Sequence, residues 1–280
     1  MTAPLFAERH PFDSLIRTER LPHIWCPGCG LGEVIGSYAK AVEKSEIPPE
    51  RHAVVSGIGC TGRAAGYIKL DSYHTTHGRA VAFATGLKLA KQDMVVTVIS
   101  GDGDLTTIGG NHIIHAARRN IDINVILVNN FNYGMTGGQF GATTPHTAVT
   151  ATSRYGNVEY PFKMPELLAA AGASYVARWT SLHIQQMQES IEKMMENPGF
   201  SVVEIISPCP TRFGRKNRFK TGISMMKWYE EQSIKADGID LELTYANVLK
   251  DDAFPVGEFV IDSKPSYLMN KHNIEGRYRQ

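Results

Sequence analysis

The chain has 280 residues, of which 42% are apolar and 20% are charged, and its formal net charge is +1. This balance is typical of an ordinary globular protein and gives no reason to expect nucleic-acid binding. Its longest apolar stretch, residues 94–99 with Thr97 inside it, is far shorter than the ~20 residues that cross a bilayer, so we expect no membrane span. The charged N-terminal residues lack the apolar segment of a signal peptide, which favours a cytoplasmic location.

Apolar periodicity predicts alternating strands and helices along most of the chain. Short β-branched runs predict strands at 53–56, 94–100, 123–128, 174–177 and 200–206. Helical spacing of apolar residues predicts helices at 30–43, 78–91, 108–119, 164–171 and 181–195. Because such alternation is typical of parallel crossover units, we expect an α/β fold with a parallel sheet that helices cover on both faces.

The alternation ends after Thr211, where a basic stretch runs from Arg212 to Lys220. We expect one domain over residues 1–215 and an irregular C-terminal extension over residues 216–280. Since few segments of the extension could form a core of their own, it should pack on the domain or on a partner subunit. The basic stretch could bind coenzyme A phosphates or an acidic protein, and a solvated charged surface is the alternative.

Glycine-rich polar loops follow three of the predicted strands. In the second loop Asp102 lies between Gly101 and Gly103, which let the backbone approach an anion while the carboxylate holds a cation. The third loop contains Asn130 and Asn132. Because parallel strands end at one edge of a sheet, Asp102, the Asn130 amide oxygen and the Asn132 backbone carbonyl could share one Mg²⁺. A Gly-Asp-Gly turn formed for conformational reasons alone is the alternative.

The cysteines are expected to act together as ligands. Cys26 and Cys29 share the tight turn Cys-Pro-Gly-Cys, Cys60 lies in the first glycine-rich loop, and Cys209 follows the last predicted strand. A reducing cytoplasm disfavours disulfides, so ligation of a metal or a cluster is the better interpretation. Four thiolates from three segments suit either one zinc ion or one iron–sulfur cluster.

Five segments, which follow one another in the same order along the chain, resemble the β subunits of 2-oxoacid:ferredoxin oxidoreductases. These subunits belong to the thiamine-diphosphate enzyme superfamily. The segments are Trp25–Gly30, Gly57–Cys60, His74–Ala80, Gly101–Asp104 and Tyr133–Gln139. The resemblance implies a thiamine-diphosphate-binding fold with Mg²⁺. It also implies that the four cysteines bind one 4Fe–4S cluster beside the cofactor, which favours the cluster over zinc.

The resemblance further implies which side chains face the cofactor and the substrate. Arg63 would contact the substrate, at a position that is often lysine in relatives, and a surface arginine is the alternative. His77 is favoured over His74 as a catalytic group beside the diphosphate, with a purely structural histidine as the alternative. The residues expected to bind the cofactor are Gly59, Thr61, His77, Gly101, Gly103, Asp104, Asn130, Tyr133, Gly134, Met135 and Thr136.

The activity implied by the resemblance is oxidative decarboxylation of a 2-oxoacid, best matched by 2-oxoglutarate, to acyl-CoA and carbon dioxide. Electrons would pass singly through the cluster to ferredoxin. A separate α subunit would complete the active site, in an assembly of two αβ units. The alternatives are a pyruvate or broad-specificity oxidoreductase, a non-redox thiamine-diphosphate decarboxylase with a structural zinc, and a non-catalytic metal-binding scaffold.

Overall fold

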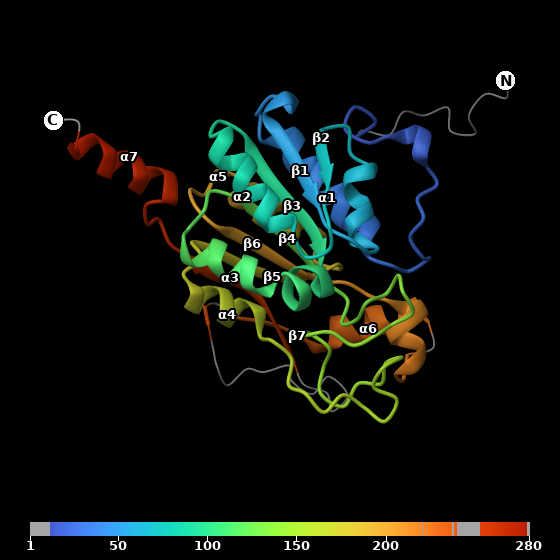
Figure 1. Ribbon diagram of the computed structural model, residues 1–280. Coiled ribbons are helices and arrows are strands. Elements are labelled where there is room, and N and C mark those ends of the chain that lie inside the picture. The colour runs from blue at the N-terminus through green and yellow to red at the C-terminus, as the bar shows by residue number, and fades with distance from the viewer. Residues whose placement is uncertain (1–11, 220, 237, 240–252, 279–280) are drawn as a thin grey trace, which may run out of the picture.

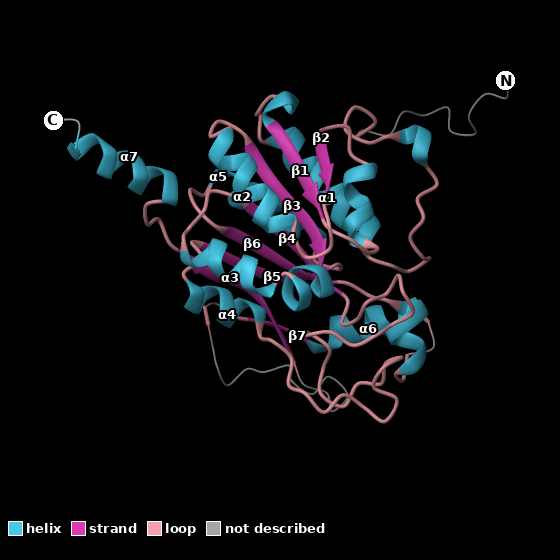
Figure 2. Cartoon of the chain, in the orientation of Figure 1, coloured by secondary structure: helices cyan, strands magenta, loops and turns pink. Residues whose placement is uncertain are grey.

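The computed structural model describes residues 12–219, 221–236, 238–239 and 253–278. The strands in it are β1 (His52–Ser56), β2 (Asp71–His74), β3 (Val95–Gly101), β4 (Asn124–Asn129), β5 (Tyr175–Thr180), β6 (Ser201–Ile206), β7 (Ser233–Lys235) and β8 (Phe254–Ile261). They form one sheet in the order β2-β1-β3-β4-β6-β5-β8-β7 (Figure 2). Every pairing is parallel except that between β5 and β8, which is antiparallel.

Seven α-helices occur among the described residues. They are α1 (Leu31–Lys44), α2 (Ala80–Ala90), α3 (Gly110–Arg118), α4 (Met164–Ala171), α5 (Ile184–Glu196), α6 (Gly222–Gln232) and α7 (Tyr267–Tyr278). One face of the sheet packs against α1 and α5 through residues such as Val34 and Ile191, and the other packs against α2, α3 and α4 through residues such as Val81 and Ile113 (Figure 1). The predicted α/β fold with helices on both faces is therefore confirmed.

All the strands and helices that apolar periodicity predicts are present, with ends shifted by a few residues. Strands β1, β4, β5 and β6 are buried along their whole length, as expected of parallel strands covered on both faces. Strand β2 was not predicted, because its four residues are exposed at the edge of the sheet and have no apolar run. No helix in the described part of the chain is long and apolar enough to cross a membrane.

The C-terminal extension differs from the irregular segment that was expected. It contributes α6, which begins with a capping box between Thr221 and Ser224, and it adds β7 and β8 to the sheet. Apolar residues of β8, including Phe254 and Val256, are buried. The sheet therefore continues across the expected boundary at residue 215. The last helix, α7, projects from the end of the domain (Figure 1), and parts of the extension lie outside the described residues.

Candidate functional site

A small cavity of about 90 Å³ lies where β1, β3 and β4 end. Parallel strands of open α/β sheets place their ligand-binding loops at this edge. The cavity contains every residue that was expected to bind the cofactor or Mg²⁺, together with Ile58 and Cys60. Its lining residues are Ile58, Gly59, Cys60, Thr61, His77, Gly101, Asp102, Gly103, Asp104, Asn130, Asn132, Tyr133, Gly134, Met135 and Thr136.

Asp102 follows β3 and is almost completely buried, with 2% of its surface exposed. The Thr143 hydroxyl donates a hydrogen bond of 2.7 Å to Asp102 Oδ2. Burial raises the pKa of Asp102 to about 7, against the opposing effect of hydrogen bonds from Thr143 and from backbone N–H groups. A cation bound at this position would offset the unfavourable burial of the ionised carboxylate.

The loop after β4 is rich in amide oxygens. Asn130 Oδ1 accepts hydrogen bonds from the Asn132 backbone N–H at 3.3 Å and from Asn132 Nδ2 at 3.2 Å. Asn132 Oδ1 is buried and has no hydrogen-bond partner among the described residues. Because buried polar atoms are nearly always paired, this oxygen fits a site that is completed by a further group.

Asp104 lines the same cavity, but its carboxylate is occupied by protein donors. Asp104 Oδ1 accepts from His77 Nδ1 at 2.5 Å, from the Gly78 N–H at 2.7 Å and from the Ile58 N–H at 3.1 Å. Asp104 Oδ2 accepts from the Ser100 hydroxyl at 2.9 Å. These contacts connect the loops after β1 and β2 to the end of β3, so Asp104 holds these loops together in addition to lining the cavity.

His77 is the histidine that the structure brings to the cavity. Its side chain is 31% exposed, and its ring packs edge-on against Tyr133 with centroids 6.0 Å apart. Since Nδ1 faces Asp104, Nε2 remains for the cavity and makes no hydrogen bond within the described part of the chain. His74 and Arg63 are exposed and lie outside the cavity lining.

The four cysteines are free thiols that lie near enough to influence one another electrostatically, and Cys60 lines the cavity. A methyl group added at Gly134 would lie 3.5 Å from Cys209 Sγ and 3.8 Å from Cys60 Sγ. Burial raises the pKa of Cys29 to about 12, and the other three cysteines add to the shift. No three His, Cys, Asp or Glu side chains within the described ranges converge closely enough to hold a single metal ion.

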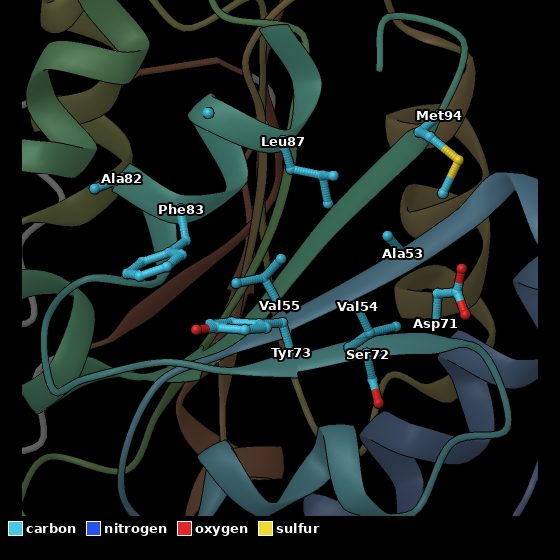
Figure 3. Close-up of a pocket in the computed structure, with 11 residues that line it drawn as sticks. Ala53, Val54, Val55, Asp71, Ser72, Tyr73, Ala82, Phe83, Leu87 and Met94 are labelled. Carbon is cyan, nitrogen blue, oxygen red and sulfur yellow. The ribbon is translucent and has the colours of Figure 1, made fainter. Parts of the chain in front are cut away.

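A larger cavity of about 620 Å³ lies between α2 and strands β1 and β2 (Figure 3). Its lining is mainly apolar and includes Tyr73 and Phe83, whose rings stack with centroids 5.1 Å apart. None of the cofactor, metal or catalytic residues predicted from the sequence lines this larger cavity. The candidate site is therefore the smaller, more polar cavity at the carboxyl edge of the sheet.

Three residues of the site were not predicted. Ile58 lines the cavity, Thr143 holds Asp102, and Ser100 holds Asp104. Ile58 belongs to the Gly57–Cys60 segment, which resembles the family, so that segment was the sequence signal for it. Thr143 stands 41 residues from Asp102 in an irregular loop, where no spacing pattern points to a shared site.

Known proteins resemble this chain both in sequence and in structure. Residues 55–205 match the family model described as the C-terminal TPP binding domain of thiamine pyrophosphate enzymes. The 2-oxoglutarate synthase subunit KorB of Methanothermobacter marburgensis is 49% identical over 92% of this chain and 90% of its own length. The KorB subunit of Methanocaldococcus jannaschii is 46% identical over 95% of this chain and 97% of its own length.

A solved structure agrees with these relatives. The 2-oxoglutarate:ferredoxin oxidoreductase from Magnetococcus marinus, solved with 2-oxoglutarate, coenzyme A and succinyl-CoA bound, superimposes with a TM-score of 0.83 and 30% identity. The match covers 97% of this chain and 92% of the solved chain. The resemblance found in the sequence motifs is thereby confirmed, and the chain belongs to the family of 2-oxoacid:ferredoxin oxidoreductase β subunits.

Proposed function

We propose that this β subunit binds thiamine diphosphate through Mg²⁺ and carries one 4Fe–4S cluster beside it. The observation that carries the proposal is the convergence of oxygen ligands and cysteines from distant segments on one small cavity. The Mg²⁺ ligands would be Asp102, Asn130 and Asn132, and the cluster ligands would be Cys26, Cys29, Cys60 and Cys209.

The chemistry of the cavity supports Mg²⁺. Hard cations prefer carboxylate and carbonyl oxygens, which Asp102, Asn130 and Asn132 supply at adjacent strand ends. The buried Asp102 carboxylate lacks a cationic partner among the groups that shift its pKa, and Asn132 Oδ1 lacks a hydrogen-bond partner within the described residues. A cation would satisfy both atoms.

The arrangement of the thiols supports a cluster over a zinc ion. Zinc holds four thiolates about 2.3 Å from one centre, so their sulfur atoms must converge closely. In a 4Fe–4S cluster each cysteine binds a different iron, so the sulfur atoms stand farther apart. The thiols influence one another electrostatically without converging at single-ion spacing in the described part of the chain, which suits the cluster.

Thiamine diphosphate bound here would supply the carbanion chemistry for decarboxylating a 2-oxoacid. The buried Thr61 hydroxyl would donate to the diphosphate, and His77 Nε2 would hold or transfer a proton at the cavity wall. The exposed Arg63 guanidinium would bind the substrate carboxylate through two parallel hydrogen bonds. Gly134 lines the cavity, and a methyl group added to it would lie 3.5 Å from Cys209 Sγ and 3.8 Å from Cys60 Sγ, so electrons leaving the substrate would have a short path to the cluster.

The names of the relatives support further parts of the proposal. We propose 2-oxoglutarate as the substrate and coenzyme A as the acyl acceptor, since the solved relative is named for 2-oxoglutarate and was solved with both. An α subunit would complete the active site in an αβ dimer of dimers, and ferredoxin would accept the electrons. Arg212, Arg215 and Lys216 of the basic stretch are exposed, and we propose them as contacts for acidic partners or phosphates. Arg218 lies over the Phe219 ring, and Lys220 lies outside the described residues. The cytoplasm is the proposed compartment, because free thiols persist as ligands under reducing conditions.

The test is anaerobic purification of the chain with its partner subunit, followed by visible and electron paramagnetic resonance spectra. The spectra are recorded before and after addition of 2-oxoglutarate with coenzyme A, and pyruvate with coenzyme A serves as the comparison. We expect a brown cluster that 2-oxoglutarate reduces faster than pyruvate does. A colourless protein that contains zinc would overturn the redox function and leave a thiamine-diphosphate decarboxylase. Turnover by the isolated β subunit would contradict the need for an α subunit.

A further inference from the structure

A buried ion pair crosses two central strands of the sheet. Arg178 of β5 and Glu204 of β6 stand opposite each other in the parallel register, and Arg178 Nε donates to Glu204 Oε2 at 2.7 Å. Their side chains are 0% and 2% exposed, respectively. The neighbouring residues on the same strands, such as Val176 and Val202, are apolar.

Stability alone does not explain this pair. Removing two charges from water costs several kcal/mol per ion, and well-packed apolar residues of similar volume often stabilise a protein as well or better. Parallel strands that are covered on both faces are usually apolar throughout. A charged pair in this position therefore points to a task that an apolar pair could not perform.

The task is indicated by the second oxygen of the carboxylate. Glu204 Oε1 accepts a hydrogen bond of 2.8 Å from Asn129 Nδ2, at the end of β4. An ionised carboxylate only accepts hydrogen bonds, so it fixes the Asn129 amide with its NH₂ group toward Glu204. The Asn129 Oδ1 atom is thereby turned to Phe131, whose backbone N–H donates to it at 3.1 Å.

Phe131 needs such support. Its φ of +65° lies in the left-handed region, which is unfavourable for a bulky residue without a local constraint. The residue stands between Asn130 and Asn132, the two amide residues of the proposed Mg²⁺ site. The conformation of Phe131 therefore decides where both neighbours present their oxygens.

We infer that Arg178 and Glu204 are positioning residues, which orient the Asn129 amide and thereby hold the Phe131 turn that presents Asn130 and Asn132 to the cation. The inference rests on the proposed Mg²⁺ site, and it adds a mechanism by which the sheet interior controls that site. Replacing a residue that orients a metal ligand through hydrogen bonds commonly changes metal affinity by about 10–100-fold.

The test measures Mg²⁺ affinity in the presence of thiamine diphosphate by calorimetric titration of the full chain in complex with its partner subunit. Glu204→Gln places a donor amide beside Arg178 or Asn129 and should weaken Mg²⁺ binding about 10–100-fold. Asn129→Ala should produce a similar loss. If the pair acts through Asn129, the double variant should lose no more than either single variant.

The matched control is Glu258→Gln, which neutralises a glutamate of the same sheet. Glu258 pairs with Lys193 at 2.8 Å, and their side chains are 24% and 53% exposed. It stands in β8, away from the cavity, and should leave Mg²⁺ affinity unchanged. Should Glu204→Gln fail to fold, Arg178→Met combined with Glu204→Leu removes both charges together and should fold while showing the same weak Mg²⁺ binding.

A second readout needs neither Mg²⁺ nor cofactor. Hydrogen exchange of the segment 130–136 reports the protection of the Phe131 amide, and Glu204→Gln should lose this protection while Glu258→Gln keeps it. Unchanged exchange in Glu204→Gln, or full Mg²⁺ affinity, would overturn the inference. A wild-type protein that binds no Mg²⁺ would refute the proposed metal site, whereas the exchange measurement would still decide whether the ion pair holds the loop.

Discussion

Asp104 Oδ1 accepts a hydrogen bond of 2.5 Å from His77 Nδ1, and the same oxygen accepts from the backbone N–H groups of Gly78 and Ile58. A carboxylate offers no proton in its ionised form, so this contact places the histidine proton on Nδ1. One buried side chain thereby sets both the tautomer of His77 and the position of two loops that line the cavity.

Replacing Asp104 with asparagine should therefore affect both stability and cofactor binding. The new NH₂ group would face N–H or O–H donors, so we expect a loss of about 1–3 kcal/mol in the free energy of unfolding. Affinity for thiamine diphosphate should fall as well, because His77 and the Ile58 loop lose their common anchor. Urea unfolding and a thiamine-diphosphate titration measure the two effects. Ser100→Ala removes one donor only and should show a smaller change in both.

The loop after β1 can be tested through Gly57. A methyl group added there would lie 1.8 Å from Asp104 Oδ2, so Gly57→Ala must displace the carboxylate or the loop. We expect a lower melting temperature together with weaker thiamine-diphosphate binding. Gly36→Ala is the control, because a methyl group on this α1 residue meets nothing within 4 Å and should stabilise the helix by up to about 1 kcal/mol. Equal melting temperatures for Gly57→Ala and the wild type would contradict the expectation.

Asp102→Asn should separate metal binding from folding. The variant removes the only carboxylate proposed as a Mg²⁺ ligand, so Mg²⁺-dependent binding of thiamine diphosphate should be lost. The metal-free protein should be no less stable at pH 8, since burial raises the pKa of Asp102 to about 7 and makes its ionised form unfavourable there. Thr143→Ser keeps the hydroxyl that holds Asp102 and should retain binding. Cofactor binding by Asp102→Asn at wild-type affinity would contradict the role of Asp102 as a Mg²⁺ ligand, whereas a wild-type protein that binds no thiamine diphosphate would favour a non-catalytic scaffold.

Cys209→Ala should abolish the intact cluster, because each of four cysteines would bind a different iron. Iron analysis and electron paramagnetic resonance after anaerobic purification measure the loss. Ser207→Ala, which changes a buried hydroxyl two residues earlier, is the control and should retain the iron. Four irons with an unaltered spectrum in Cys209→Ala would show that another group supplies the fourth ligand.

The buried histidine at the start of β1 predicts a loss of stability in acid. Burial, together with the neighbouring Arg51 cation, lowers the pKa of His52 below its ordinary value of 6.5. The unfolded chain therefore binds a proton more readily than the folded protein, so the free energy of unfolding should decrease as the pH falls below about 6.5. Melting temperatures measured from pH 8 to pH 5 should fall less steeply in His52→Leu than in the wild type. Parallel curves would exclude this histidine as the cause.

The sequence alone determined the layered fold and most of the cavity. Helical and strand periodicities are local properties, so runs such as 53–56 and 123–128 were sufficient to predict β1 and β4. The loops after β3 and β4 were predicted as a common site because parallel strands end at the same edge of a sheet. The sequence was therefore sufficient to place Gly101, Asp102 and Asn130 in one site.

The tertiary structure alone decided how the strands are ordered and which distant side chains meet. No local pattern shows that β8 runs antiparallel to β5, because that pairing depends on burial of the extension against an existing sheet. The Arg178–Glu204 pair exists only because β5 and β6 lie side by side in a particular register. Contacts between residues far apart in sequence depend on strand order and register, which the periodicity of single segments does not encode.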